Sequence, residues 1–250
     1  MKRIVLVTGA TSGFGWEIAT IFAKAGDAVI ATGRRKERLE ELKNSLPGAD
    51  IFPLVMDVTC KEEVAKAIAS LPAAYQAVDI LVNNAGLALG LEKAPEANLE
   101  DWETMVDTNI KGVLYVTKAV ISGMKARKRG YIFNIGSTAG NWPYEGGNVY
   151  GATKAFIKQF SLNLRTDLKG TGIRVTNIEP GFAKTDFSLV RFKGDENRAD
   201  AVYNNTKPLE AADIATIIFT CANFPEHVNV NFLEVMSVRQ SYGGLVVEKD

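Results

Sequence analysis

The stretch that most constrains the fold is a glycine-rich loop from Thr8 to Gly15, with the sequence TGATSGFG. It follows the apolar run Ile4-Val5-Leu6-Val7 and precedes a segment with helical character over residues 16–25. A strand, a glycine-rich turn and a helix in this order begin a dinucleotide-binding βαβ unit. The start of a helix carries unpaired N–H groups and the positive end of the helix dipole, so it attracts a pyrophosphate. The loop therefore predicts a dinucleotide site, although a glycine-rich turn alone also fits an ordinary tight turn.

Glycine is needed wherever the backbone must approach a phosphate closely, because a Cβ would block the contact. We assign the turn to Gly9, the close approach to Gly13 and the tight contact between helix and strand to Gly15. The expected cofactor-binding residues of the loop are Gly9, Thr11, Ser12, Gly13, Phe14 and Gly15.

Length and composition fit one catalytic domain spanning residues 1–250. The chain has 46% hydrophobic and 23% charged residues, a balance typical of a globular protein with a large core. Its formal net charge is +0, so we expect neither a nucleic acid nor a membrane as a partner. No apolar run approaches the roughly 18 residues of a membrane span, and the first run is too short for a signal peptide. We therefore expect a cytoplasmic protein.

The chain contains few residues that bind soft metals. Cys60 and Cys221 are the only cysteines, and His227 is the only histidine. Two cysteines so far apart predict no disulfide framework and fit a reducing compartment. The same scarcity argues against a zinc site and against a Ser-His-Asp triad, so we expect no metal.

Apolar runs without polar alternation are separated along the chain by helical segments. Strands are expected over residues 4–7, 28–32, 51–56, 78–82, 131–135, 174–178 and 231–236. Helices are expected over residues 16–25, 36–46, 61–71, 99–107, 112–127, 149–168 and 211–222. Strands of this kind are buried on both faces, as in a parallel sheet covered by helices on each side. The pattern predicts an α/β fold, a doubly wound parallel sheet of about seven strands in a Rossmann-like three-layer sandwich.

One segment departs from this alternation. Residues 188–208 are polar, contain Lys193-Gly194-Asp195-Glu196 and follow the sixth expected strand. We interpret them as a mobile substrate lid over the carboxyl ends of the strands, with a plain surface insertion as the alternative.

The residues after the second expected strand bear on the choice of cofactor. A carboxylate there binds the 2′-hydroxyl of NAD, whereas an arginine accommodates the 2′-phosphate of NADP. This chain has Arg34 and Arg35 at that place. A guanidinium grips a phosphate with two parallel hydrogen bonds, so the pair predicts NADP, with a solvated arginine pair as the alternative. After the third expected strand, Asp57 is assigned to the exocyclic amine of the adenine and Val58 to the face of its ring.

Ser137, Tyr150 and Lys154 together indicate acid–base chemistry. Ser137 follows the fifth expected strand, and Tyr150 and Lys154 open a long helix with the i, i+4 spacing that places them on one face. A Tyr-x-x-x-Lys pair alone is common on helix surfaces, but here it accompanies a serine at a strand end and a dinucleotide loop. We predict that Tyr150 exchanges a proton with the substrate oxygen while a hydride moves to or from the nicotinamide. Ser137 is expected to position the same oxygen.

The ordinary pKa of a phenol, about 10, is too high for this role at neutral pH. The Lys154 ammonium and the positive ring of the oxidised nicotinamide are expected to lower the pKa of Tyr150. Lys154 is also expected to hold the nicotinamide ribose. We assign Asn109 to a water that relays protons toward Lys154, with a satisfied amide in a helix interruption as the alternative.

Taken together, these residues make the chain resemble the short-chain dehydrogenase/reductase family over essentially its whole length. The matching positions are the loop from Thr8 to Gly15 and Asn83, Asn84, Ala85, Gly86, Asn109, Ser137, Tyr150, Lys154, Pro180, Gly181 and Thr185. The resemblance implies a Rossmann-like fold, a Ser-Tyr-Lys-Asn tetrad and a homotetramer or dimer, of which we expect the homotetramer. It also implies further cofactor contacts from the residues Asn83, Asn84, Ala85, Gly86, Pro180, Gly181, Phe182 and Thr185.

Within the family the chain is similar to the subgroup of NADP-dependent 3-hydroxy acid dehydrogenases, which includes L-allo-threonine and serine dehydrogenases. The shared stretches are residues 101–103, 136–140, 142–144, 147–150, 179–181 and 190–194. The subgroup implies oxidation of the 3-hydroxyl of a short acid or amino acid, such as serine, L-allo-threonine or 3-hydroxypropionate, or the reverse reduction. A carboxylate substrate needs a cation, and we assign Arg191 to it beside Ser137 and Tyr150. Aromatic residues expected to wall the pocket are Trp142, Tyr144, Phe182 and Phe187.

Three alternatives stay open. An NADPH-dependent carbonyl reductase of another ketone, aldehyde or keto-sugar acid would have the same motifs, because substrate choice lies in the variable lid. A non-catalytic NADP-binding sensor would keep the loop but has no use for a complete tetrad. A nucleotide-sugar epimerase or dehydratase also uses tyrosine and lysine, but 250 residues leave little room for a sugar domain. The C-terminal residues 237–250 are expected to pack on a neighbouring subunit.

Overall fold

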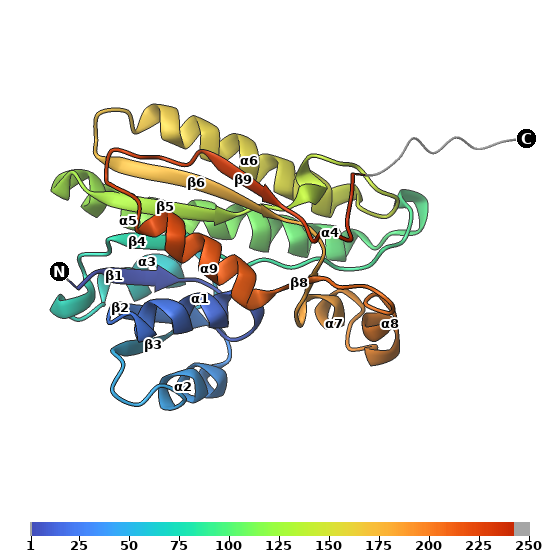
Figure 1. Ribbon diagram of the computed structural model, residues 1–250, viewed down its shortest axis with the longest axis horizontal. Helices are drawn as coiled ribbons and strands as arrows, with labels where there is room; N and C mark the ends of the chain where they lie inside the picture. Colours follow the sequence, from blue (N-terminus) through green and yellow to red (C-terminus); the bar gives the residue numbers. More distant parts are fainter. Residues whose placement is uncertain (1, 243–250) are drawn as a thin grey trace, which may run out of the picture.

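The main sheet contains seven strands: β1 (Ile4–Val7), β2 (Ala28–Gly33), β3 (Ile51–Val55), β4 (Ile80–Asn83), β5 (Gly130–Ile135), β6 (Ile173–Pro180) and β9 (Phe232–Val235). The computed structural model, which describes residues 2–242, arranges them in the order β3-β2-β1-β4-β5-β6-β9, all parallel (Figure 1). After β1 the chain runs outward to β3 and then returns to add β4 on the other side of β1. In a doubly wound sheet this switch point, at the carboxyl ends of the strands, is where ligands bind.

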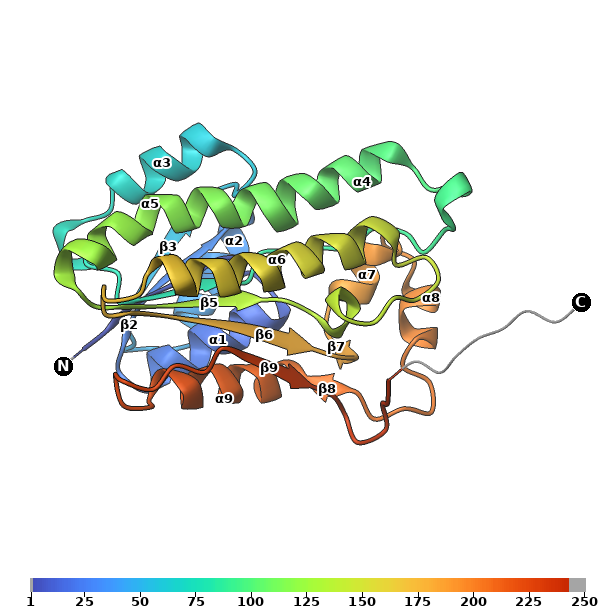
Figure 2. The same ribbon diagram turned by 90° about the horizontal axis from the view of Figure 1, so that it is seen from above.

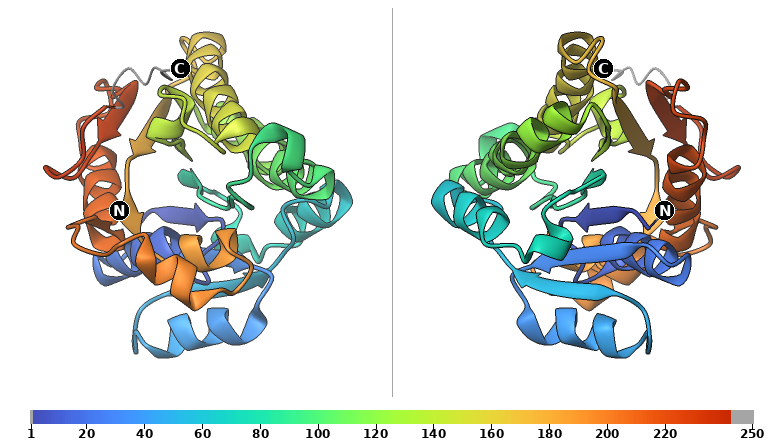
Figure 3. Two further views of the ribbon diagram at one scale, coloured as in Figure 1. Left: turned by 90° about the vertical axis from the view of Figure 1, so that its right-hand side faces the viewer. Right: turned by 90° about the vertical axis from the view of Figure 1, so that its left-hand side faces the viewer.

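The helices are α1 (Gly13–Lys24), α2 (Lys36–Asn44), α3 (Lys61–Ala69), α4 (Leu99–Val106), α5 (Gly112–Arg127), α6 (Asn148–Asp167) and α9 (Ala211–Ala222). They cover both faces of the sheet, as the end-on views along the strands show (Figure 3). The expected α/β three-layer fold is thus confirmed.

Side chains alternate along each strand between two buried cores. In β1, Val5 and Val7 join the core beneath α1 and α9, whereas Leu6 joins the core beneath α3 and α5 (Figure 2). This period of two is what a strand buried on both faces requires. The strands are therefore held rigidly, and the loops at their carboxyl ends start from fixed positions.

The segment expected to be a lid is partly helical. It contains α7 (Phe187–Arg191) and α8 (Glu196–Ala201), and a small parallel sheet of β7 (Ala183–Lys184) and β8 (Leu209–Glu210) frames it. The segment lies beyond the carboxyl end of β6, at the place predicted for it (Figure 1). The polar sequence shows no helical periodicity, so the two short helices depend on contacts with other residues. For example, the Ser188 hydroxyl bonds to that of Tyr203 at 2.7 Å.

Two further features refine the predictions. The helices expected over residues 99–107 and 112–127 are joined by a π-helical turn, η3 (Asp107–Lys111), so the chain continues helically from α4 to α5. Of the expected C-terminal contact segment, residues 243–250 lie outside the part that the structure describes, while Tyr242 stacks on Trp142 with ring centroids 4.6 Å apart.

Two absences hold for residues 2–242. No helix in this range has the length and apolarity needed to cross a membrane. The same range contains no group of three or more histidine, cysteine or acidic side chains arranged to hold a metal ion.

Candidate active site

The glycine-rich loop joins β1 to α1 in the conformation that a phosphate site needs. Gly9 and Gly13 have φ values of 67° and 52°, in the left-handed region that favours glycine. A Cβ on Gly15 would overlap the carbonyl oxygen of Gly9, so the first turn of α1 lies directly against the loop. A Cβ on Gly13 would lie 3.3 Å from that of Thr185, which places Thr185 beside the loop.

The end of β4 supports this loop from the neighbouring strand. The backbone N–H groups of Asn84 and Ala85 donate to Thr8 Oγ1 at 3.0 and 2.9 Å, and Asn84 Nδ2 donates to the Thr8 carbonyl at 2.8 Å. Asn83 is different, because its Nδ2 is buried and donates to Thr117 Oγ1 and Asn134 Oδ1. The Asn83 side chain therefore belongs to a polar network inside the core, and only the residues after it reach the cofactor side.

Three arginines surround the loop where the adenosine end of a dinucleotide would lie. Arg35 Nη2 donates to Thr11 Oγ1 at 2.7 Å and to Ser12 Oγ at 3.1 Å. Arg34 is largely exposed and lies 4.0 Å from Asp57. Arg38, which the sequence analysis missed, donates to the Thr11 carbonyl at 3.3 Å and lies over the Trp16 ring. Its position three residues after Arg35 in α2 is the signal that would have identified it.

Asp57 and Val58 follow β3 as predicted, with different exposure. Asp57 Oδ1 accepts from the N–H and hydroxyl of Thr59 at 2.9 and 2.8 Å, while Oδ2 faces Arg34. Val58 is buried, and a Cβ on Gly112 at the start of α5 would lie 2.9 Å from its Cγ2. Asp57 thus retains one oxygen for a ligand, whereas much of the Val58 side chain packs under α5.

Tyr150 and Lys154 lie one turn apart near the start of α6 and are 8% and 7% exposed. Lys154 Nζ donates to the Ile135 carbonyl at 2.8 Å and lies 5.8 Å from the centroid of the Tyr150 ring. Ser137, after β5, accepts from the N–H of Ala139 at 3.1 Å and donates to the Pro180 carbonyl at 3.4 Å. The predicted Ser-Tyr-Lys group is therefore assembled at the carboxyl ends of β5 and β6.

Burial dominates the acid–base properties of this pair. It raises the pKa of Tyr150 to about 12 and lowers the pKa of Lys154 to about 8, because the charged form of each is poorly solvated. A hydrogen bond with Ser137 and the positive charge of Arg191 lower the pKa of Tyr150, while Tyr144 raises it. The expected lowering of the Tyr150 pKa by Lys154 is therefore wrong for the chain's own groups, since the lysine amine is directed to a backbone carbonyl.

Asn109 lies in the π-helical turn η3 and hydrogen-bonds to the backbone of the loop that contains Leu87. Its Nδ2 donates to the Leu87 carbonyl at 2.8 Å and to Thr153 Oγ1 at 3.0 Å, and its Oδ1 accepts from the Leu87 N–H at 2.8 Å. These contacts match the alternative of a satisfied amide and leave one acceptor position for a water. Gly86 is adjacent, because a Cβ there would lie 3.2 Å from Asn109 Oδ1 and 3.5 Å from Lys154 Nζ.

Arg191 extends from α7 into the space beside Tyr150. Its guanidinium carbon lies 5.2 Å from the centroid of the Tyr150 ring, 5.1 Å from that of Phe187 and 5.9 Å from that of Tyr144. Nη2 donates to the Tyr144 hydroxyl at 2.8 Å, whereas Nε is buried without a hydrogen-bond partner among the described residues. A buried cationic donor with an unused N–H, beside the predicted proton donor, is suited to an anionic ligand group.

The other residues predicted for this region have distinct places. Tyr144 and Phe187 are the two aromatic residues that lie at Arg191. Phe182 packs on Tyr203, and Trp142 packs on Tyr242. The remaining cofactor candidates adjoin the lid: the Gly181 and Phe182 N–H groups donate to the Val235 carbonyl and Gln240 Oε1, and Thr185 Oγ1 accepts from the Phe187 N–H.

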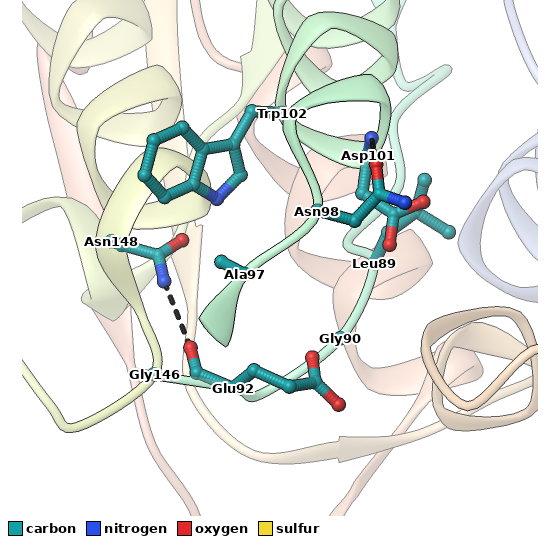
Figure 4. Close-up of a pocket in the computed structure, with 9 residues that line it drawn as sticks. All are labelled: Leu89, Gly90, Glu92, Ala97, Asn98, Asp101, Trp102, Gly146 and Asn148. Carbon is teal, nitrogen blue, oxygen red and sulfur yellow. Dashed lines mark hydrogen bonds between the residues drawn. The ribbon is translucent and has the colours of Figure 1, made fainter. Parts of the chain in front are cut away.

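The lid is joined to the body of the protein next to a small hollow. Figure 4 shows the side chains around this hollow, including Asn148, whose Nδ2 donates to the Glu92 carbonyl at 3.1 Å. Two lining residues also contact the lid: Asp101 pairs with Lys193 at 2.8 Å, and the Gly90 N–H donates to the Arg191 carbonyl at 3.0 Å. The segment expected to be a lid is therefore bonded to the body of the protein, and Phe187 and Arg191 of α7 lie against the Tyr150 ring.

Comparisons with known proteins identify the family of this chain. The family model described as short chain dehydrogenase matches residues 3–195. The NADP-dependent 3-hydroxy acid dehydrogenase YdfG of Escherichia coli strain K12 is 57% identical over 247 residues, 98% of this chain and 99% of that protein. Sulfoacetaldehyde reductase 2 of Chromohalobacter salexigens is 51% identical over 252 residues, covering all of both chains.

Solved structures give the same result. A closed form of serine dehydrogenase complexed with NADP+ superimposes with a TM-score of 0.98 at 57% identity, covering 99% of this chain and 100% of that one. Serine dehydrogenase from Escherichia coli superimposes with a TM-score of 0.85 at 52% identity, covering 96% and 100%.

Proposed function

The chain belongs to the short-chain dehydrogenase family, and from this premise we propose that it is an NADP-dependent oxidoreductase of short 3-hydroxy acids or 3-hydroxy amino acids. The proposed substrates are serine, L-allo-threonine and 3-hydroxypropionate, oxidised at the 3-hydroxyl, or the matching 3-keto compounds in reverse. Relatives named for NADP and for such acids support the proposal.

One observation of the site carries the choice of an acidic substrate. The guanidinium of Arg191 lies at the Tyr150 ring, its buried Nε has no hydrogen-bond partner among the described residues, and Tyr150 is hydrogen-bonded to Ser137. A substrate with an anionic group near its hydroxyl satisfies this buried N–H, while a neutral alcohol leaves it unpaired.

The residues around the loop fit NADP. Left-handed glycines leave room for the pyrophosphate, and Arg34, Arg35 and Arg38 supply positive charge for the 2′-phosphate. Other proposed cofactor residues are Thr11, Ser12, Phe14, Gly15, Asp57, Val58, Asn84, Ala85, Gly86, Pro180, Gly181, Phe182 and Thr185. When bound, the nicotinamide donates or accepts the hydride.

We assign the work of the site to residues at the start of α6, after β5 and at the end of α7. Tyr150 moves the proton at the substrate oxygen, Ser137 holds that oxygen, and Arg191 holds the anionic group. Lys154 binds the nicotinamide ribose. Asn109 keeps the Leu87 backbone in place and has one acceptor position left for a relay water.

A second candidate is reduction of a short sulfonated aldehyde, favoured by the same guanidinium. Sulfoacetaldehyde and the keto form of 3-hydroxypropionate both place an anionic group one methylene from an aldehyde, and a relative of this chain is named for sulfoacetaldehyde. A guanidinium binds sulfonate and carboxylate oxygens alike, so the two substrates compete for one site.

The test follows NADPH formation by its near-ultraviolet absorbance with NADP+ or NAD+ and each proposed acid, and NADPH consumption with sulfoacetaldehyde. Tyr150→Phe is expected to lower kcat by about 10²- to 10⁴-fold while NADPH still binds. Tyr75→Phe is the matched control, because Tyr75 also has a pKa raised to about 12 but bonds to Asp50 at the edge of the sheet. Equal activity of wild type and Tyr150→Phe would contradict the assignment.

Replacement of the lid arginine tests the anionic site. Arg191→Ala is expected to raise KM for the hydroxy acids about 10- to 100-fold, the loss of a charge-assisted hydrogen bond in a buried site. An unchanged KM would remove Arg191 as the carboxylate ligand.

We further propose a cytoplasmic homotetramer. The free thiols of Cys60 and Cys221 support a reducing compartment, and the family resemblance supports the assembly. Sedimentation equilibrium of the purified protein tests the tetramer, and a monomer at micromolar concentration would contradict it.

A further inference from the structure

Two cations from different structural elements lie near the Tyr150 ring. Lys154 comes from the same helix as Tyr150, and its Nζ lies 5.8 Å from the ring centroid. Arg191 comes from the lid helix α7, and its guanidinium carbon lies 5.2 Å from the same centroid. Lys154 donates to the Ile135 carbonyl, whereas Arg191 retains an unpartnered buried Nε. Neither cation forms an ion pair with a carboxylate among the described residues, and Arg191 has a buried N–H left for a ligand.

The other groups around Tyr150 carry no charge that would cancel this field. Ser137 and Tyr144 face it with hydroxyls, and α4 packs against it with Met105 and Trp102. Asp101 of α4 pairs with Lys193 rather than with Arg191. Among residues 2–242, no carboxylate forms an ion pair with Arg191.

We propose that Arg191 controls how readily Tyr150 gives up its proton, and that an anionic substrate group switches this control off by pairing with the guanidinium. The second half of the proposal rests on the proposed function, which brings such a group to Arg191. The first half depends only on the protein.

The physical reason is a cation acting across a buried space. A positive charge within about 4–6 Å favours the ionised form of an acid and lowers its pKa by about one to three units when water is excluded. The direction agrees with Arg191 being a cause that lowers the pKa of Tyr150. An anion bound to Arg191 neutralises that charge, so the Tyr150 pKa rises again and the phenol becomes a better proton holder once substrate is seated.

As a consequence, proton transfer at Tyr150 depends on the position of the lid and on the charge of the substrate. With the lid closed and no anion, Tyr150 is most readily deprotonated, which suits removal of a proton from an incoming alcohol. With an acid substrate bound, the phenol is held protonated more strongly, which suits donation to a carbonyl. The pH dependence of kcat should therefore show a lower pKa for oxidation of a neutral alcohol than for oxidation of a hydroxy acid.

The experiment titrates position 150 directly and needs no turnover. 3-Fluorotyrosine, whose phenol is more acidic than that of tyrosine, is placed at position 150 of the full chain, and its ¹⁹F resonance is followed against pH. Arg191→Gln is expected to raise the fluorophenol pKa by about one to three pH units, and Arg191→Lys to raise it less. Propionate or ethanesulfonate, two unreactive anions, is expected to raise the pKa in the protein with Arg191 but not in Arg191→Gln.

Arg198→Gln is the matched control, because Arg198 is also a lid arginine lying over a ring, that of Phe192, 4.5 Å away. It is expected to leave the titration unchanged. The proposal is overturned if Arg191→Gln shifts the pKa by no more than Arg198→Gln does. If Arg191→Gln fails to fold, an absent response of the otherwise unchanged protein to both anions overturns the switch. Failure of the proposed function would instead appear as no turnover of hydroxy acids with an intact Arg191 effect on the titration.

Discussion

At the scale of single residues, burial of Lys154 makes the stability of the fold depend on pH. Its amine donates one hydrogen bond in a buried site, and the ammonium form is disfavoured because its other donors lack water. Its pKa falls from 10.5 to about 8. Between these pH values the folded protein binds fewer protons at Lys154 than the unfolded chain does, so this group makes stability rise with pH across the window.

We therefore expect Lys154→Met to remove that rise. The free energy of unfolding of the variant, minus that of wild type, should fall by up to about 3 kcal/mol as pH increases from 8 toward 10.5. Urea unfolding at a series of pH values measures it, and other titrating groups cancel in the difference. Parallel curves for the two proteins across this window would show that Lys154 is not held in an abnormal protonation state.

The placement of site residues could be predicted wherever their spacing in the sequence determines it. The i, i+4 spacing of Tyr150 and Lys154 places them on one face of any helix that contains them, and the glycines of the loop predict a turn. The direction of the Tyr150 pKa was not predictable, because burial is a property of the packed core. Arg38 was missed for a related reason: its contact with Thr11 exists only after α2 packs beside the loop.

At the scale of elements, the segment proposed as a lid, residues 188–208, is built on two short helices. Its α7 and α8 are five and six residues long, too short to be stable helices alone. An ion pair from Lys193 to Asp101 and a backbone bond from Gly90 to Arg191 connect it to the body. Lid opening should therefore respond to single changes at these contacts.

Lys193→Gln is expected to speed amide hydrogen exchange over residues 188–201 by about two- to five-fold, since a solvent-exposed lysine contributes only weakly to the stability of the segment through its ion pair. Lys111→Gln is the matched control, because it breaks a pair of the same type, with Asp107 at 2.7 Å, outside the lid. Mass spectrometry of the exchanged peptides compares the two. Equal exchange in both variants would show that the ion pair does not keep the lid closed.

Element types were predictable from hydrophobic patterns, but two boundaries were not. Residues 188–208 are predicted as a mobile lid without assigned helices, because their polar sequence has no apolar period, whereas bonds such as that between Ser188 and Tyr203 accompany short helices there. The π-helical turn η3 was expected as a gap between two helices. Asn109 lies within this turn, and its side chain bonds to Leu87, which is 22 residues earlier in the chain and which no local pattern could place there.

At the scale of the whole molecule, the two ends of the sheet differ in how their polar groups are paired. The carboxyl end holds the loop, the largely exposed Arg34 at 4.0 Å from Asp57, and Arg191, whose buried Nε has no hydrogen-bond partner among the described residues. At the amino end, buried Asp27 accepts from Arg3 at 2.6 Å and Asp79 accepts from Arg129 at 2.6 Å. Paired charges stabilise the fold, while unpaired groups remain available to ligands, so stability and activity should separate by the end of the sheet that is altered.

Asp27→Asn tests this separation. Asp27 accepts from Arg3 through its backbone N–H, Nε and Nη2, and Arg3 also bonds to the Ala222 carbonyl at the end of α9. Loss of the carboxylate charge leaves the guanidinium poorly paired, so the free energy of unfolding should fall by about 2 kcal/mol with kcat unchanged.

The neighbouring pair of Lys2 and Asp50 provides the control, because it is exposed. Lys2→Gln should change the free energy of unfolding by less than about 1 kcal/mol. Urea unfolding and initial rates with NADP+ measure both variants. A tenfold fall in kcat for Asp27→Asn would mean that the rigid sheet transmits a change at its amino end to Tyr150, and the two ends could then not be treated as independent.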